Sequence, residues 1–205
     1  MRSFGISEVV INIHHFADLV RAHLAAHDNF GMRIELSQEE ILLDTGGGLK
    51  QAAHFFVHDP EPFVLHNVDV ISTIDIDRMV AYHRSHGGLA TLAVHDRETS
   101  RPLLFDANLQ LCGRIVGHDR KTEIVRASKD LRPLAFSGIH VISPRLLTMM
   151  DEEAVFPIIP TYLRVAQQGE QIIGFTADQY YWWDLGRLKD LEQAARELQT
   201  PGPNL

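Results

Sequence analysis

The chain has 205 residues, of which 45% are hydrophobic and 22% charged, a composition typical of one globular domain or a small pair. The net charge of -8, without a Lys/Arg block, excludes an extended nucleic-acid-binding surface, because phosphate backbones are bound by clustered positive charge. The sequence has no apolar run near the ~20 residues of a membrane span, no signal-peptide core, and one cysteine, Cys112, which excludes an intramolecular disulfide. We therefore expect a cytoplasmic protein that binds neither nucleic acid nor membranes.

The first half of the chain alternates strand-like and helix-like segments. Period-two or β-branched apolar patterns predict strands at 8–13, 32–36, 63–70 and 89–95. Helical spacing predicts helices at 16–26, 48–56 and 75–85. This alternation predicts an α/β fold, with a mostly parallel sheet flanked by helices.

The second half begins with an interruption of this pattern. Short segments punctuated by Asn108, Gly113 and Gly117 predict a hairpin excursion over 101–124. Strands are then expected at 135–142 and 172–176, and helices at 144–150, 158–168 and 188–198. Because no repeat or convincing linker is present, we expect a single domain over residues 1–205.

Two aspartates, Asp69 and Asp184, each follow an apolar segment and are candidates for a metal or substrate site. Asp69 is expected at the end of the strand 63–70, and ligands of open α/β sheets bind outside the carboxyl ends of the strands. Asp184 follows two tryptophans in YYWWDLGR, where apolar surroundings raise the cost of an unpaired carboxylate. The structural alternatives are a turn aspartate at 69 and a helix N-cap or turn at 184.

Glycines mark two further positions. Gly46, Gly47 and Gly48 stand directly before a helix-like run in EEILLDTGGGLK, where main chain without Cβ lets a base or phosphate approach. A flexible loop explains the same pattern, since neither a P-loop nor GxGxxG is present. Gly138 interrupts a predicted strand, which often indicates close approach of a ligand or another main-chain segment.

The twelve histidines include one pair with metal-ligand spacing. His54 and His58 stand four residues apart, which places two imidazoles on one helix face. We do not favour a zinc site, because the Glu of HExxH is absent and Asp59-Pro60 ends any helix there. A histidine-based metal hydrolase is a distant third hypothesis.

Five motifs in this order resemble the sugar-1-phosphate nucleotidyltransferases, especially the mannose-1-phosphate guanylyltransferase and N-acetylmuramate-1-phosphate uridylyltransferase type. The resemblance spans nearly the whole chain and rests on VVINIHHFAD, EEILLDTGGGLKQA, FVLHNVDV, AFSGIHVISP and WWDLGRLKDLEQA. It implies a Rossmann-like, nucleotide-diphospho-sugar transferase-like fold. It also implies an enzyme that transfers a nucleotidyl group from an NTP to a sugar-1-phosphate and releases pyrophosphate.

The resemblance also assigns roles to residues. Asp69 and Asp184 would hold Mg²⁺, an ion that prefers hard oxygen ligands. Gly138 would allow the sugar to approach. The nucleotide would be contacted by five residues: Glu40, Thr45, Gly46, Gly47 and Gly48.

Some expected family features are absent. Arg187 stands where the family has Thr, and Val68 replaces a small Gly or Ser before Asp69. The family's first strand, its loop GxGxRxxPLT and the PKP segment, which supply an Arg and a Lys, have no counterpart here, so we assign no catalytic residue. Phe4-Gly5 also looks like the end of a helix whose body is missing.

These departures predict an N-terminally incomplete domain that lacks the first strand, the phosphate loop and most of the first helix, and whose activity is impaired. Loss of a central strand would leave two unpaired edges, which favours association and makes a homo-oligomer possible. The alternative function is a non-catalytic nucleotide or nucleotide-sugar binding protein. The base and the sugar are not specified by these motifs.

Overall fold

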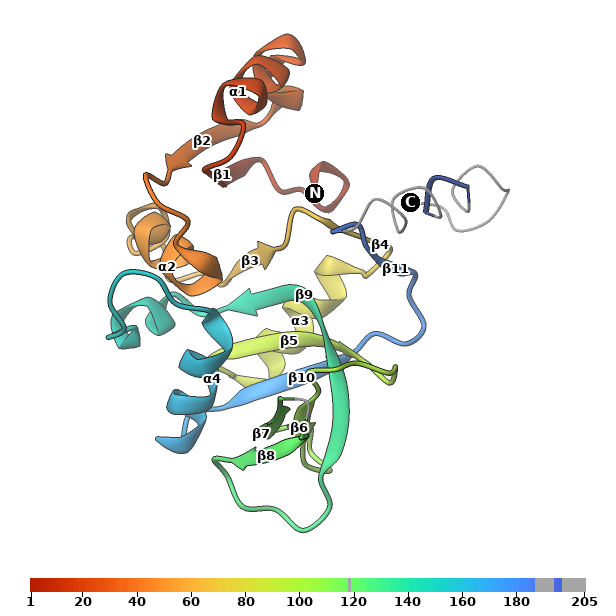
Figure 1. Ribbon diagram of the computed structural model, residues 1–205. Helices are drawn as coiled ribbons and strands as arrows, with labels where there is room; N and C mark the ends of the chain where they lie inside the picture. The colour runs from red at the N-terminus through yellow and green to blue at the C-terminus, as the bar shows by residue number, and fades with distance from the viewer. Residues whose placement is uncertain (118, 187–193, 197–205) are drawn as a thin grey trace. The chain divides into compact units, whose positions relative to one another are not determined.

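The computed structural model describes residues 1–117, 119–186 and 194–196 (Figure 1). The described chain forms two compact units, one of residues 1–61 with 144–161 and one of residues 62–143 with the segment from 162 onward. Helix α4 (Ile158–Gln167) begins in the first unit and ends in the second. The predicted final helix over 188–198 lies mostly outside the described residues, and so does Arg187.

The first unit is built on one βαβ crossover. Strands β1 (Glu8–Ile13) and β2 (Arg33–Gln38) pair in parallel, and α1 (Ala17–Ala26) connects them, as their patterns predicted. Short 3₁₀ segments η1 (Arg2–Phe4) and η2 (Asp28–Gly31) flank these elements. Gly5 closes η1 in the left-handed conformation, with φ 72°, which confirms the glycine cap expected at this position. The unit continues through α2 (Asp44–Gln51), η3 (Ala52–Phe55) and η4 (Pro144–Met149).

Helix α2 begins earlier than its sequence suggested. The three glycines at 46–48 lie inside its first turns, whereas we predicted a helix that begins only at the last of them, over 48–56. Consecutive glycines disfavour a helix by about 1 kcal/mol each relative to Ala, so local propensity argued for a loop. Packing overrides that preference, because all three glycines are buried.

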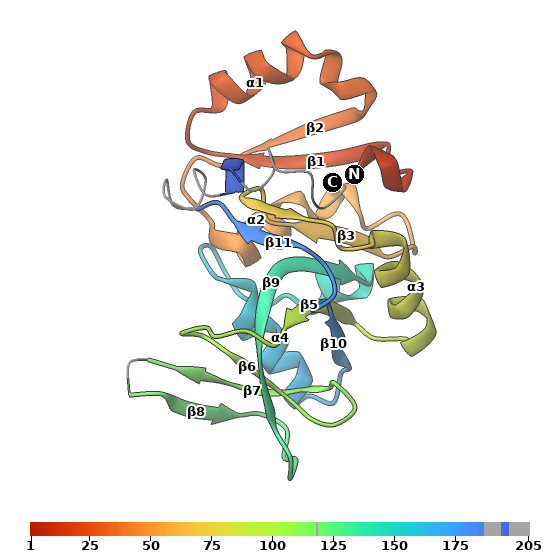
Figure 2. The same cartoon turned by 90° about the vertical axis from the view of Figure 1, so that its right-hand side faces the viewer.

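The second unit contains the main sheet (Figures 1 and 2). Strand β9 (Arg132–Ile142) lies at its centre and pairs with β3 (Phe63–His66) on one side and with β5 (Ala90–His95) on the other. Strand β10 (Ile172–Thr176) extends the sheet beyond β5, and the far end of β9 continues into β6 (Leu103–Phe105), β7 (Leu111–Val116) and β8 (Lys121–Ile124). The predicted hairpin excursion is therefore confirmed.

Alternating side chains attach a helix to each face of this sheet. On one face, His83 of α3 (Ile76–His86) bonds Thr91 of β5, with 2.8 Å between Nδ1 and Oγ1. His140 of β9 pairs with Leu92, the next residue of β5, and so points to the opposite face. There its Nδ1 lies 2.8 Å from the hydroxyl of Tyr162 in α4. The period of two thus places α3 and α4 on opposite faces.

The predicted strand over 63–70 is broken. It consists of β3, a turn at 67–69, and β4 (Val70–Ser72), which pairs antiparallel with β11 (Trp182–Asp184) in a separate ribbon. The turn is closed by a hydrogen bond from the Val70 N–H to the Asn67 carbonyl (3.2 Å). Asp69 therefore lies in a turn between two strands, not at the end of one strand.

The α/β class with a helix-flanked sheet is confirmed. The main sheet is mixed, because β10–β5 is parallel while β9 runs antiparallel to β3, β5 and β6. The parallel pair β1–β2 forms a sheet of its own. Each of β1 and β3 has a single strand partner within the described residues, β2 and β9 respectively. No helix in the described ranges has the length and apolar character of a membrane span.

Candidate functional site

The β4–β11 ribbon brings Asp69 and Asp184 together. Asp184 stands opposite Val70 in the antiparallel register, and the Leu185 N–H donates to the Asp69 carbonyl at 2.7 Å. Asp184 Oδ1 accepts from the Gly186 N–H at 2.9 Å, the turn contact named as the structural alternative at this position. This oxygen and one oxygen of Asp69 lie 3.0 and 3.3 Å from the position that a Cβ would take on Gly186. The two exposed carboxylates therefore converge on a small space that the glycine leaves open.

This pair has the donor chemistry of a magnesium site. Mg²⁺ is usually held by one or two carboxylates, and waters and substrate phosphates complete its octahedral shell. A group of three or more His, Cys, Asp or Glu side chains suited to a metal does not occur in the described part of the chain. Two carboxylates facing open space fit an ion whose remaining ligands come from substrate and water.

Gly138 forms a bulge in β9 beside this ribbon. Residues 137–139 stand opposite Ala93 alone, and Gly138 has φ 75°, a conformation that favours glycine. A Cβ on Gly138 would lie 2.9 Å from the Asn67 amide nitrogen. The close approach at this glycine is thus made by the protein's own Asn67, and the predicted sugar contact stays a prediction.

The bulge turns three successive carbonyls of β9 toward three other segments. The Gly138 carbonyl accepts from the Asn67 N–H at 2.9 Å, in the turn that contains Asp69. The Ser137 carbonyl accepts from the indole N–H of Trp182 at 2.8 Å. The Phe136 carbonyl accepts from Arg97 Nη2 at 3.3 Å. One irregularity of β9 therefore positions both aspartate-bearing segments and an arginine.

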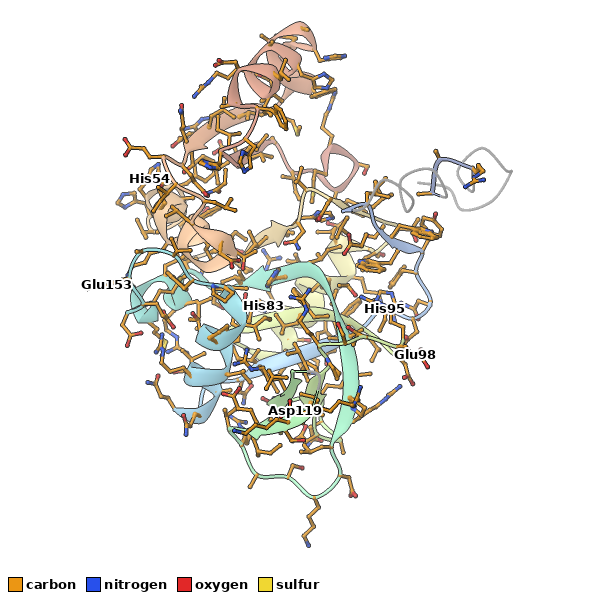
Figure 3. The ribbon with its side chains drawn as sticks, in the orientation of Figure 1. His54, His83, His95, Glu98, Asp119 and Glu153 are labelled. Atoms are coloured by element: carbon orange, nitrogen blue, oxygen red, sulfur yellow. The ribbon has the colours of Figure 1, made fainter. Side chains whose placement is uncertain are left out.

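Arg97 and His95 lie where β5 ends, and both lie close to the Trp182 ring. The guanidinium carbon of Arg97 is 4.2 Å from the Trp182 ring centroid, a cation–π contact. The imidazole of His95 lies 6.0 Å from the same tryptophan, with its Nδ1 2.6 Å from the Ser137 hydroxyl. Burial lowers the pKa of His95, so it is neutral at pH 7. Figure 3 shows His95 at this end of β5 and Glu98 at the tip of the following loop.

In the first unit, the glycines at 46–48 pack against the protein's own chain. The N–H groups of Gly46 and Gly47 both donate to the Phe156 carbonyl, at 2.9 and 3.1 Å. A Cβ on Gly46 would fall within 2.4 Å of the Phe156 ring, and one on Gly47 within 2.5 Å of the Ala154 carbonyl. The Thr45 hydroxyl accepts from the Ile158 N–H at 3.0 Å. These contacts explain the small residues, and the nucleotide contact stays a prediction.

Glu39, which the sequence did not single out, is the buried acid of this segment. It is 7% exposed, whereas the predicted Glu40 is exposed. One Glu39 oxygen accepts from the Asn12 amide and the other from the Leu43 N–H, both at 2.9 Å. The Asn12 amide also donates to the Gly48 carbonyl at 2.9 Å. Glu39 thus connects β1 to the start of α2.

The structure also places His54, one of the two histidines with metal-ligand spacing, and the unpredicted Arg97. His54 pairs with Glu35, its Nε2 2.7 Å from the carboxylate, and this contact raises the pKa of His54. Arg97, like Glu39, was missed, because its position depends on β9 and β11, far away in sequence. The sequence held one signal, because Arg97 is the second residue after the predicted strand 89–95, at its carboxyl end.

Comparison with known proteins shows the family. The profile described as nucleotidyl transferase matches residues 1–103, half of the chain. The chain belongs to the nucleotidyl transferase family. Relatives include the mannose-1-phosphate guanyltransferase beta-B of Xenopus laevis, 26% identical over 196 residues (91% of this chain, 50% of that protein). The mannose-1-phosphate guanyltransferase of Gibberella zeae is 25% identical over 199 residues, with the same coverage. The chain therefore spans about half the length of these curated relatives.

Solved structures show the same fold. HddC from Yersinia pseudotuberculosis complexed with GMP-PN superposes with a TM-score of 0.75 at 13% identity, covering 97% of this chain and 81% of that chain. A UDP-glucose pyrophosphorylase complexed with UDP-glucose gives a TM-score of 0.70 at 13% identity, covering 96% and 82%. The nucleotidyl transferase fold predicted from the five motifs is thus confirmed.

Proposed function

We propose that this family member transfers a nucleotidyl group from a nucleoside triphosphate to a sugar-1-phosphate in a Mg²⁺-dependent reaction. The observation that supports it is the convergence of Asp69 and Asp184 on the space beside Gly186. Phosphoryl chemistry depends mainly on positioning and on neutralising negative charge, and the metal ion would supply that charge here. Asp69 and Asp184 would hold it.

The substrates follow from the relatives' names. Two are mannose-1-phosphate guanyltransferases, so a hexose-1-phosphate and GTP are the first pair to test. Glu40, Thr45 and Gly46–Gly48 are the proposed nucleotide contacts, and Gly138 the proposed sugar contact. In the first unit, Glu39 and the Phe156 carbonyl would keep the nucleotide segment in one conformation. Cytoplasmic location remains a prediction from the sequence.

We further propose that residues outside this sequence complete the phosphate-binding part of the domain. The motif GxGxRxxPLT is absent from the 205 residues. Within the described residues, β1 pairs with β2 alone and β3 with β9 alone, so each strand can accept another strand along its second edge. Without that segment the chain lacks the loop's Arg and Lys and is expected to turn over slowly.

A pyrophosphate-release assay tests both proposals. Mg²⁺ and pairs of NTP and sugar-1-phosphate are supplied to the 205-residue chain and to a chain extended by the residues encoded in frame upstream of Met1. We expect release that needs both substrates, is faster in the extended chain and is lost in Asp184→Asn. Binding of nucleotide or nucleotide sugar by the extended chain without release would instead identify a non-catalytic binding protein. The absence of a GxGxR-like sequence upstream would contradict the second proposal.

A further inference from the structure

Arg97 lies on the same side of β11 as the metal-site aspartate. Its guanidinium covers the ring of Trp182, at 4.2 Å from the centroid. Trp182 and Asp184 are two residues apart in β11, so their side chains leave the same face of the strand, about 7 Å apart along it. Burial lowers the pKa of Arg97, and the Asp184 carboxylate partly opposes this shift, which is consistent with the two side chains lying on the same side of β11.

The Arg97 guanidinium is held in place but not neutralised. It donates from Nη1 to the Glu98 carbonyl at 3.4 Å and from Nη2 to the Phe136 carbonyl at 3.3 Å. It makes no ion pair with a carboxylate among the described residues, because neighbouring Asp96 accepts from Arg132 instead, at 2.7 Å. A guanidinium has five N–H donors and remains charged at any physiological pH, so Arg97 keeps donors for a ligand.

The loop that carries Arg97 lines a cavity of about 740 Å³. Its walls carry two cations, Arg97 and Arg120, two acids, Asp96 and Glu98, and the hydroxyl residues Thr99 and Ser100. Small-molecule sites typically measure about 300 to 1,000 Å³, so a sugar phosphate fits this volume. Hydroxyl groups suit sugar hydroxyls, and a planar guanidinium suits the paired oxygens of a phosphate.

We propose that Arg97 binds the phosphate group of the sugar-1-phosphate and holds it beside the Asp69–Asp184 pair. This inference rests on the proposed function for the identity of the substrate, but the arginine site itself does not. The stack on Trp182 and the two carbonyl contacts hold the Arg97 guanidinium in place before the ligand binds, which reduces the entropy lost on binding. Arg97 then supplies a cation to the substrate phosphate from within these 205 residues.

Tryptophan fluorescence offers a direct readout. The chain contains two tryptophans, Trp182 and Trp183, both in β11, and Arg97 lies on the first. Inorganic phosphate, mannose-1-phosphate and unphosphorylated mannose are titrated into the 205-residue protein in the presence of Mg²⁺. Arg97→Gln removes the charge, and Arg97→Lys keeps the charge without the planar fork. Arg101→Gln, an exposed arginine of the same loop, is the matched control. Thermal melting verifies that each variant is folded.

We expect Arg97→Gln to weaken mannose-1-phosphate binding at least tenfold, Arg97→Lys to lie between, and Arg101→Gln to bind within about twofold of the parent chain. Mannose should bind equally to all. Equal affinity of the parent and Arg97→Gln proteins for phosphate compounds overturns the inference, and so does the absence of any phosphate binding. Arg97-dependent binding of inorganic phosphate, without nucleotidyl transfer by the extended chain, supports the arginine site while the proposed function fails.

Discussion

One oxygen of Asp69 and one of Asp184 lie within 3.3 Å of the point where a side chain on Gly186 would begin. The two residues are far apart in sequence, and the β4–β11 pairing with the Leu185-to-Asp69 hydrogen bond joins them. The space between the carboxylates depends on Gly186 having no Cβ.

Gly186→Ala should therefore reduce metal binding more than it reduces stability. The added methyl would contact both carboxylates and occupy the space for an ion, so we expect Mn²⁺ affinity to fall roughly tenfold or more. Titration of Mn²⁺ followed by electron paramagnetic resonance measures the affinity, and thermal melting of the same samples measures stability. Unchanged Mn²⁺ affinity in a folded Gly186→Ala protein would exclude the space beside Gly186 as the ion's position.

Gly138→Ala tests the bulge in β9. A non-glycine residue at φ 75° costs about 1 to 2 kcal/mol, and the new Cβ would also meet Asn67 at 2.9 Å. We expect a lower free energy of unfolding in urea titrations and a shifted tryptophan emission, since Trp182 is held by the neighbouring Ser137 carbonyl. Adding Asn67→Ala to the Gly138→Ala protein should restore the part of the lost stability that is due to the clash. If Gly138→Ala alone keeps both stability and emission, the bulge does not position Trp182.

Glu39→Ala should destabilise the first unit, whereas Glu40→Ala should not. Removal of the Glu39 carboxylate leaves the Asn12 amide and the Leu43 N–H without these acceptors in a part-buried setting, at a cost of about 2 kcal/mol. Glu40 is exposed, and its replacement should change stability by less than about 0.5 kcal/mol. Urea unfolding of the two variants provides the comparison. Equal effects would show that the adjacent acids are structurally equivalent.

Stability should fall as the pH drops below the ordinary histidine range. Burial lowers the pKa of His83 to about 4 and of His140 to about 3, from 6.5 in the unfolded chain. Both are stabilising when neutral, so their contribution is complete above pH 6.5 and is lost as the pH falls toward those folded-state values. Each adds a slope of about 1.4 kcal/mol per pH unit in that window. Urea unfolding of the parent and His83→Gln proteins between pH 8 and 5 should show a shallower dependence in the variant. Parallel pH profiles would contradict a buried neutral His83.

The regular elements of the fold were readable from local patterns. Strands such as β1 and β5 and helices such as α1 and α3 follow apolar periods that depend on nearby residues alone. The start of α2 was not readable, because three glycines argue against a helix and only packing against Phe156 makes one there. The break at 67–69 escaped prediction for a similar reason, since that turn is fixed by a hydrogen bond from its Asn67 N–H to the Gly138 carbonyl of the β9 bulge.

For the candidate site, the sequence indicated which residues take part but not how they are arranged in space. Asp69 and Asp184 could be proposed as partners through the resemblance, but their pairing depends on β4 and β11 meeting. Arg97 and Glu39 were missed because the residues that hold them are distant in sequence. Arg97 is placed by Trp182 and the Phe136 carbonyl, and Glu39 by Asn12, all distant along the chain.

The metal site at Asp69 and Asp184 can be tested without turnover by measuring Mn²⁺ binding to the parent, Asp69→Asn, Asp184→Asn and Asp178→Asn proteins. Asp178 is the control, since its carboxylate accepts the Asp96 N–H outside the pair. We expect one ion per chain in the parent and Asp178→Asn proteins, and no bound ion in Asp69→Asn or in Asp184→Asn. Retention of that ion in both Asp69→Asn and Asp184→Asn would contradict a metal site at this pair.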